Sequence, residues 1–129
     1  MTQPPGFWSL FGFEVEGADA DGVVLRMTVP DELMSPFGAV HGGAIALMFD
    51  TGLAVAIARR LGQHDRIATH NLNVSFVAFA SNPVLRCHAR VVSLRTAVAI
   101  VEGEIVDSGG TLIAKAMGTF GVRRMPPAD

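Results

Sequence analysis

HGGAIALMFDTGLAVAIA, residues 41–58, is the stretch of the sequence that decides the fold. Its residues 44–58 contain 12 apolar side chains in 15 positions and no proline, which predicts a buried helix. A helix needs roughly 20 apolar residues to span a bilayer, so this run is too short and we expect no membrane partner. Arg59 and Arg60 follow the run, and Gly62 is the predicted C-cap.

Segments on both sides of this helix have the composition of β-strands. A short helical turn is expected at 7–10, followed by strands at 11–16 and 23–29. Four more segments rich in β-branched and apolar residues come after the helix, at 67–79, 84–94, 97–106 and 112–122. The turns between them are too short for parallel crossovers. We therefore predict an α+β fold, an antiparallel sheet wrapped around one long central helix.

The overall composition sets limits on the class of protein. With 129 residues, of which 50% are hydrophobic, the chain fits one domain spanning residues 1–129. A formal net charge of −2 supplies no basic field for nucleic acid, so we expect no nucleic-acid partner. The single cysteine, Cys87, excludes an internal disulfide, and residues 1–6 lack the features of a signal peptide. Both observations predict a cytoplasmic protein.

Asp50 is the most unusual residue of the predicted helix, because it lies in an otherwise apolar run. Its helical neighbours at three and four positions are Leu47, Ala46, Leu53 and Ala54, none of which can pair with a charge. A buried and unpaired carboxylate would cost several kcal/mol. Asp50 is therefore either paired by residues from elsewhere in the fold or kept for function.

The start of the helix is a second candidate for chemistry. Gly42 and Gly43 leave the first N–H groups of the helix unobstructed, at the positive end of its dipole, where an oxyanion or a carbonyl oxygen can bind. A tight entry into the helix would explain the same glycines. His41 could hydrogen-bond the loop or transfer protons.

Spacing along the helix adds a constraint. Gly42 and Asp50 are eight residues apart, which corresponds to about 12 Å on an α-helix. Both groups cannot reach one carbonyl from the same helix. If both act on one substrate, Asp50 of one subunit must face the helix start of another, and a two-fold dimer would create two such sites.

Other catalytic schemes find no support in the sequence. There is no G-x-S-x-G nucleophile elbow, and Cys87 lies within a predicted strand without an activating motif, so we interpret it as a core residue. The four histidines, His41, His64, His70 and His88, lack metal-ligand spacing, and no glycine pattern suits a nucleotide-binding loop. We expect neither a metal nor a cofactor.

Three segments carry a family resemblance that spans most of the chain. FGAVHGGAIALMFDT (37–51), NLNVSF (71–76) and GTLIAKAMGTF (110–120) resemble the PaaI-type thioesterases, relatives of the phenylacetate-pathway and 4-hydroxybenzoyl-CoA thioesterases. The resemblance implies the hotdog fold, a homodimer that often pairs into a tetramer, and hydrolysis of an acyl-coenzyme A thioester at the dimer interface.

The resemblance also implies roles for individual residues. Gly42 would donate its N–H to the thioester oxygen beside Gly43, and Asp50 of the partner subunit would act as nucleophile or general base. Thr69 matches a hydroxyl that helps to orient the water. Ser35 stands six residues before His41, where many members carry Asn or Gln, and Arg95 lies near the position at which relatives contact the nucleotide phosphates.

Three alternatives remain at this point. A hotdog hydratase or dehydratase would need a histidine and carboxylate acid–base pair, which the spacing from His41 to Asp50 disfavours. A non-catalytic acyl-CoA binding domain is more compatible with the short side chain of Ser35. A dimer without a ligand would tolerate replacement of Asp50.

Overall fold

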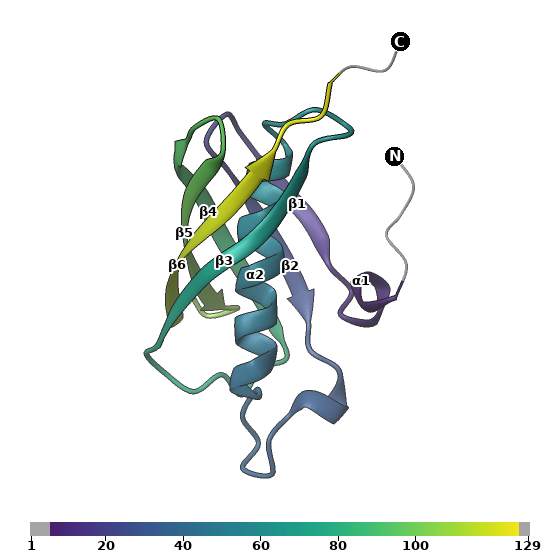
Figure 1. Ribbon diagram of the computed structural model, residues 1–129. Helices are drawn as coiled ribbons and strands as arrows, with labels where there is room; N and C mark the ends of the chain where they lie inside the picture. Colours follow the sequence, from purple (N-terminus) through teal and green to yellow (C-terminus); the bar gives the residue numbers. More distant parts are fainter. Residues whose placement is uncertain (1–5, 127–129) are drawn as a thin grey trace.

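The computed structural model describes residues 6–126, and Figure 1 shows one long helix cradled by a curved sheet. The sheet is antiparallel and contains six strands in the order β1-β2-β4-β5-β6-β3. The helices are α1 (Phe7–Leu10), α2 (Gly42–Ala58) and the short 3-10 turn η1 (Asp31–Leu33). The strands are β1 (Glu14–Ala18), β2 (Gly22–Thr28), β3 (Arg66–Phe76), β4 (Val84–Leu94), β5 (Val98–Asp107) and β6 (Leu112–Arg123).

The predicted α+β hotdog architecture is confirmed, because α2 packs against every strand except β1. Eight of its residues are buried, and they form the core together with alternate residues of β2, β4, β5 and β6. Gly52 makes the closest approach, since a Cβ there would lie 2.9 Å from the Cys87 Sγ. Within residues 6–126, no helix is long and apolar enough to cross a membrane.

Several predicted boundaries were wrong. The first strand begins at Glu14 rather than at residue 11, because Phe11 and Phe13 are buried in the turn that leads to it. Helix α2 ends at Ala58 with Arg59 as its C-cap in the right-handed helical conformation. Gly62 is therefore not the cap, and its N–H donates to the Asp65 carboxylate instead.

Strand β3 lies at the edge of the sheet, and its position could not be read from the chain order. It pairs only with β6, and no strand among residues 6–126 pairs with its other edge. It ends at Phe76 rather than at residue 79, so residues 77–83 form the connection to β4. The structure thus leaves one eleven-residue strand with an unpaired edge beside α2.

A bulge in β3 changes the direction of one side chain. His70 is the additional residue, because Thr69 pairs with Phe120 and Asn71 pairs with Thr119 on β6. Phe120 is buried and faces the core, so Thr69 faces α2 as well. Without the bulge Thr69 would share the outer face with Asn71, and bulges commonly redirect side chains in this way next to functional sites.

Candidate active site

The start of α2 offers one unpartnered backbone donor. His41 is the N-cap of the helix, and its Nδ1 accepts a 2.8 Å hydrogen bond from the Gly43 N–H. The His41 carbonyl accepts from the N–H groups of Ala44 and Ile45. Among residues 6–126 the Gly42 N–H donates no hydrogen bond. Two available donors were expected, but only one is found, because the Gly43 N–H already donates to His41 Nδ1.

An aromatic ring lies directly beside this donor. A Cβ at Gly42 would meet the Cε1 of Phe76 at 3.4 Å, and the Phe76 side chain is 58% exposed. The free N–H of Gly42 thus lies next to an aromatic ring that is itself exposed to solvent. Hydrogen bonds to such a donor are stronger beside an apolar group than in bulk water, because the local dielectric is lower.

Asp50 meets a polar partner from the edge strand. The Thr69 hydroxyl donates a 2.6 Å hydrogen bond to Asp50 Oδ1, and both residues retain contact with solvent. This is the only hydrogen bond to the Asp50 side chain within residues 6–126, so its other carboxylate oxygen is open. No helical neighbour of Asp50 could pair with its charge. Its partner is Thr69 of β3, which the bulge at His70 turns toward α2.

Ser35 and Arg95 lie apart from these two groups. The Ser35 hydroxyl oxygen accepts hydrogen bonds from the N–H groups of Phe37 and Ala39, both at 3.3 Å, which stabilises the loop before α2. Arg95 lies in the turn between β4 and β5, where its N–H donates to the Val98 carbonyl. This turn is at the opposite end of the molecule from Gly42 (Figure 1).

Cys87 can be excluded as a nucleophile. It is a free thiol with no exposed surface, and burial raises its pKa to about 12. A thiol is reactive as the thiolate, which this environment disfavours. No three His, Cys, Asp or Glu side chains within residues 6–126 are grouped in a way that could hold a metal ion.

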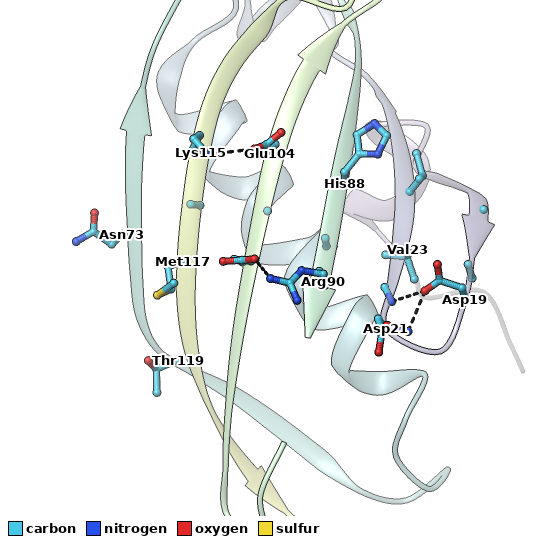
Figure 2. A pocket seen from close by; sticks show the side chains of 18 of the residues that line it. Asp19, Asp21, Val23, Asn73, His88, Arg90, Glu104, Lys115, Met117 and Thr119 are labelled. Carbon is cyan, nitrogen blue, oxygen red and sulfur yellow. Dashed lines mark hydrogen bonds and ion pairs between the residues drawn. The ribbon is translucent and has the colours of Figure 1, made fainter. Parts of the chain in front are cut away.

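A hollow of about 1100 Å³ lies on the face of the sheet away from α2 (Figure 2). None of Gly42, Asp50 and Thr69 lines it. Four of its charged side chains pair across the strands, Lys115 with Glu104 and Arg90 with Glu102, and the Asp19 carboxylate accepts hydrogen bonds from the N–H groups of Asp21 and Gly22. Charges that are already neutralised offer little to a reacting group, so the candidate active site is at α2 rather than here.

Sequence reasoning missed Phe76 as a neighbour of Gly42 and His70 as the bulge residue. The only signal in the sequence is the run THNLN, residues 69–73, in which two polar residues precede the alternation of Asn71, Leu72 and Asn73. Such an interruption of the period of two indicates a bulge when the pairing register is known.

An antiparallel sheet wrapped around one long helix is the hotdog fold. The comparisons define the class of protein. The chain belongs to the thioesterase superfamily, whose family model matches residues 37–114.

Individual relatives cover nearly the whole chain. A Halobacterium salinarum protein named as a candidate esterase is 32% identical and covers 92% of this chain and 85% of its own. A candidate thioesterase from Ralstonia eutropha, described as related to phenylacetic acid degradation, is 27% identical with a TM-score of 0.87, covering 93% and 92% of the two chains. A Bacillus halodurans protein solved with CoA is 27% identical with a TM-score of 0.81, covering 90% of this chain and 74% of that one.

Proposed function

We propose that the protein hydrolyses acyl-coenzyme A thioesters in a site formed between two copies of the chain. Asp50 of one copy acts as nucleophile or general base, and the Gly42 N–H of the other polarises the thioester carbonyl. The observation that carries the proposal is that Gly42 and Asp50 are each left with open hydrogen-bonding capacity on one helix, although about 12 Å separates them.

The unpaired edge of β3 provides a way to join the two groups. Leu72 and Val74 pack against the core and Phe76 contacts Gly42, so these three side chains face α2. Opposite residues of an antiparallel pair share a face. A two-fold pairing of two β3 strands around Asn73 therefore sets Phe76 of one copy opposite the Thr69–His70 bulge of the other. Gly42 of one copy then lies near Asp50 of the other.

The reaction needs little besides these groups. Attack by Asp50, or by a water that Asp50 deprotonates, forms a bond to the thioester carbon while the carbonyl oxygen gains negative charge near the Gly42 N–H. The C–S bond then breaks and the thiolate leaves with the bonding electrons. Where Asp50 is the nucleophile, this leaves a mixed anhydride, which water then hydrolyses to the free acid and the regenerated carboxylate. Thiolate is a good leaving group, so no strong general acid is required. The Thr69 hydroxyl holds the carboxylate in position.

The relatives support coenzyme A as the carrier of the acyl group. One neighbour was solved with CoA, and another is described as related to phenylacetic acid degradation. We extend the proposal to the whole chain, residues 1–129, as one cytoplasmic hotdog domain that assembles as a dimer or a dimer of dimers. Residues 1–5 and 127–129 lie outside the described residues, so the predictions that include them are not examined by the structure.

Release of free thiol from a panel of short, long and aromatic acyl-CoAs tests the activity, and the mass in solution tests the assembly. We expect hydrolysis of at least one class and a mass of a dimer or a multiple of it. Binding of acyl-CoA without thiol release would favour a non-catalytic binding domain. An active monomer at low concentration would contradict the two-subunit site.

A further inference from the structure

Helix α2 ends, β3 begins and β6 ends at the same end of the molecule (Figure 1), and many basic residues lie in these segments. Six of the ten Lys and Arg residues of the chain lie there: Arg59, Arg60, Arg66, Arg95, Arg123 and Arg124. Asp65 is the carboxylate placed among them. One carboxylate cannot neutralise the positive charge of six arginines.

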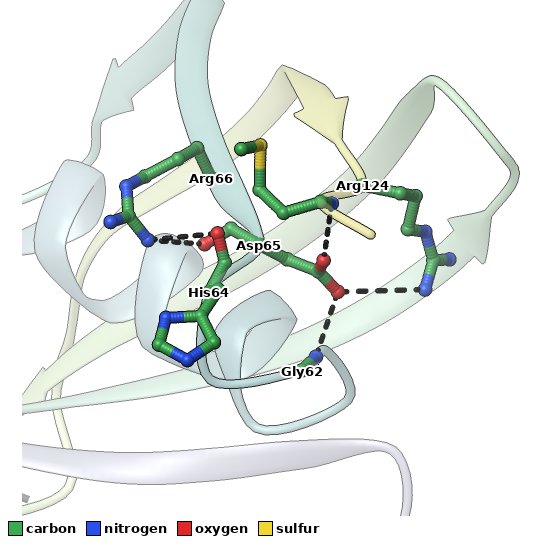
Figure 3. A network of polar contacts seen from close by, with 6 residues as sticks. Gly62, His64, Asp65, Arg66 and Arg124 are labelled. Atoms are coloured by element: carbon green, nitrogen blue, oxygen red, sulfur yellow. Dashed lines mark hydrogen bonds and ion pairs between the residues drawn. The ribbon is translucent and has the colours of Figure 1, made fainter. Parts of the chain in front are cut away.

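Both oxygens of the Asp65 carboxylate already accept hydrogen bonds within the protein (Figure 3). Its carboxylate accepts hydrogen bonds from the N–H groups of Gly62 and Met125, at 2.8 and 2.9 Å, and lies 4.0 Å from the Arg124 guanidinium. The Arg66 guanidinium bonds instead to two backbone carbonyls, those of His64 and Asp65, at 3.0 and 3.2 Å. Arg66 acts on the Asp65 carboxylate only through its charge, as the weakest influence on the pKa of that group.

Arg66 and Arg123 are directly opposite each other on β3 and β6. Like charges in this position destabilise an antiparallel pair. Within residues 6–126, the Arg123 side chain has neither an ion pair nor a hydrogen bond. The two arginines thus occupy opposed positions on neighbouring strands, and neither has an ion pair with a carboxylate within residues 6–126, so an anion bound between them would relieve their repulsion.

The bulge adds a third group to this pair. The His70 ring lies over Gly121, so closely that a Cβ there would be 2.5 Å from Nε2. Arg66, His70 and Arg123 line one hollow of about 350 Å³ at the end of the sheet. Arginine guanidinium groups bind phosphate oxygens with two parallel hydrogen bonds, and a ring N–H of histidine adds a donor.

We propose that Arg66, His70 and Arg123 form a phosphate-binding cluster that holds the nucleotide phosphates of coenzyme A. The inference rests on the proposed function, in which the substrate is an acyl-CoA. Arg66 is three residues from Thr69 along β3, or about 10 Å, so the cluster and the proposed thioester site are on one strand. The same bulge that directs Thr69 toward Asp50 directs His70 into the hollow.

Adenosine 3′,5′-bisphosphate is a suitable probe, because it carries nucleotide phosphates without a thioester. Calorimetric titration of the full chain compares wild type with Arg66→Gln, Arg123→Gln and the control Arg26→Gln. The control removes the same charge from an arginine on β2 that has only a 4.0 Å ion pair with Glu14. We expect at least about a tenfold weaker binding in the two cluster variants and less than about a twofold change in the control.

Equal losses in all three variants would mean non-specific charge attraction and would overturn the proposal. Inorganic phosphate binding as tightly as the bisphosphate would overturn the assignment to a nucleotide. Folding of the variants is checked by thermal unfolding, in which Arg123→Gln should not lower Tm, whereas Arg66→Gln also loses the bonds to the His64 and Asp65 carbonyls.

Kinetics separate this inference from the proposed function. With acyl-CoA, Arg66→Gln and Arg123→Gln should raise KM about tenfold at unchanged kcat. With the N-acetylcysteamine thioester of the same acid, which lacks the nucleotide, they should match wild type. Loss on both substrates would contradict a phosphate role. If no thioester is hydrolysed but the bisphosphate still binds through the cluster, the proposed function fails while the binding site stands.

Discussion

Two aspartates near α2 have opposite surroundings. Asp65, in the loop after the helix, accepts two backbone N–H bonds and an ion pair, and these bonds, first that of Met125 and then that of Gly62, hold its pKa below the ordinary value. Asp50, in the middle of the helix, accepts one hydrogen bond from Thr69. A carboxylate with a hydrogen bond on each of its two oxygens stabilises a structure, whereas one with an open oxygen can act on a ligand.

The same contrast separates the two ends of the helix. At its start the Gly42 N–H has no partner among residues 6–126, while beyond its end the loop is fastened to the end of β6 through Asp65. The comparison predicts that substitutions at the start and middle of α2 change turnover, and that those beyond its end change stability.

The largest expected effect is that of Asp50→Asn. The amide keeps the shape of the side chain and its hydrogen bond with Thr69 but removes the negative charge, so turnover should fall by about a hundredfold to ten-thousandfold. Stability should equal or exceed that of wild type, because a half-buried charge is removed.

Thiol release measures the rate of this variant, and thermal unfolding measures its stability. Reaction of the buried Cys87 with a thiol reagent gives an independent check, because it occurs only when the core opens. Normal hydrolysis combined with a much lower Tm would make Asp50 a structural residue, and the comparison with Asp65 would fail.

Gly42→Pro should reduce turnover by about a hundredfold to a thousandfold, the range for loss of one donor to a developing oxyanion. Gly42 is the first residue of the helix, where proline is well tolerated, and His41 already has the extended backbone that a residue before proline requires, with φ −59° and ψ 136°.

Gly42→Ala is the matched control for this substitution. It adds a Cβ against Phe76 but retains the N–H, so it should remain within about tenfold of wild type if the donor is what matters. If both variants lose the same activity, the contact with Phe76 rather than the N–H explains the loss.

A smaller effect is expected for Thr69→Val. Valine has the shape of threonine without its hydroxyl, so kcat should fall about tenfold, in line with the strength of a hydrogen bond to a charged group, while KM is unchanged. Thr69→Ser retains the hydroxyl and should recover most of the rate. If serine is as slow as valine, restoring the hydroxyl does not restore the rate, and the hydrogen bond to Asp50 is not sufficient to explain the role of Thr69.

The sequence predicted the fold well because its signals are local. The apolar run 44–58 and the strand segments are short-range patterns, and they placed α2 and most strands within a few residues. The resemblance placed Gly42 and Asp50 in one family motif and matched Thr69 to a hydroxyl position outside it. These features do not depend on how distant segments pair.

What the sequence could not provide depends on pairing and side-chain rotamers. The place of β3 beside β6, the bulge at His70 and the contact of Phe76 with Gly42 arise from residues far apart in the chain. The hydrogen bond from the Gly43 N–H to His41 depends on one imidazole rotamer. Sequence spacing fixes neither register nor rotamer, so both glycines were expected to have available donors.

The smallest expected effect concerns Asp65→Asn, which should leave kcat unchanged and lower Tm by a few degrees at neutral pH. Because the folded-state pKa of Asp65 is lowered relative to the unfolded value of about 3.9, its stabilisation is complete above that value and is lost as the pH falls through the folded-state pKa. The difference in Tm between wild type and variant should therefore be constant near pH 7 and vanish in acid. Asp50→Asn should show no such loss of Tm at neutral pH, which makes the two substitutions a direct test of the contrast. A difference in Tm that persists unchanged to low pH would show that the Asp65 charge does not fasten the loop to β6.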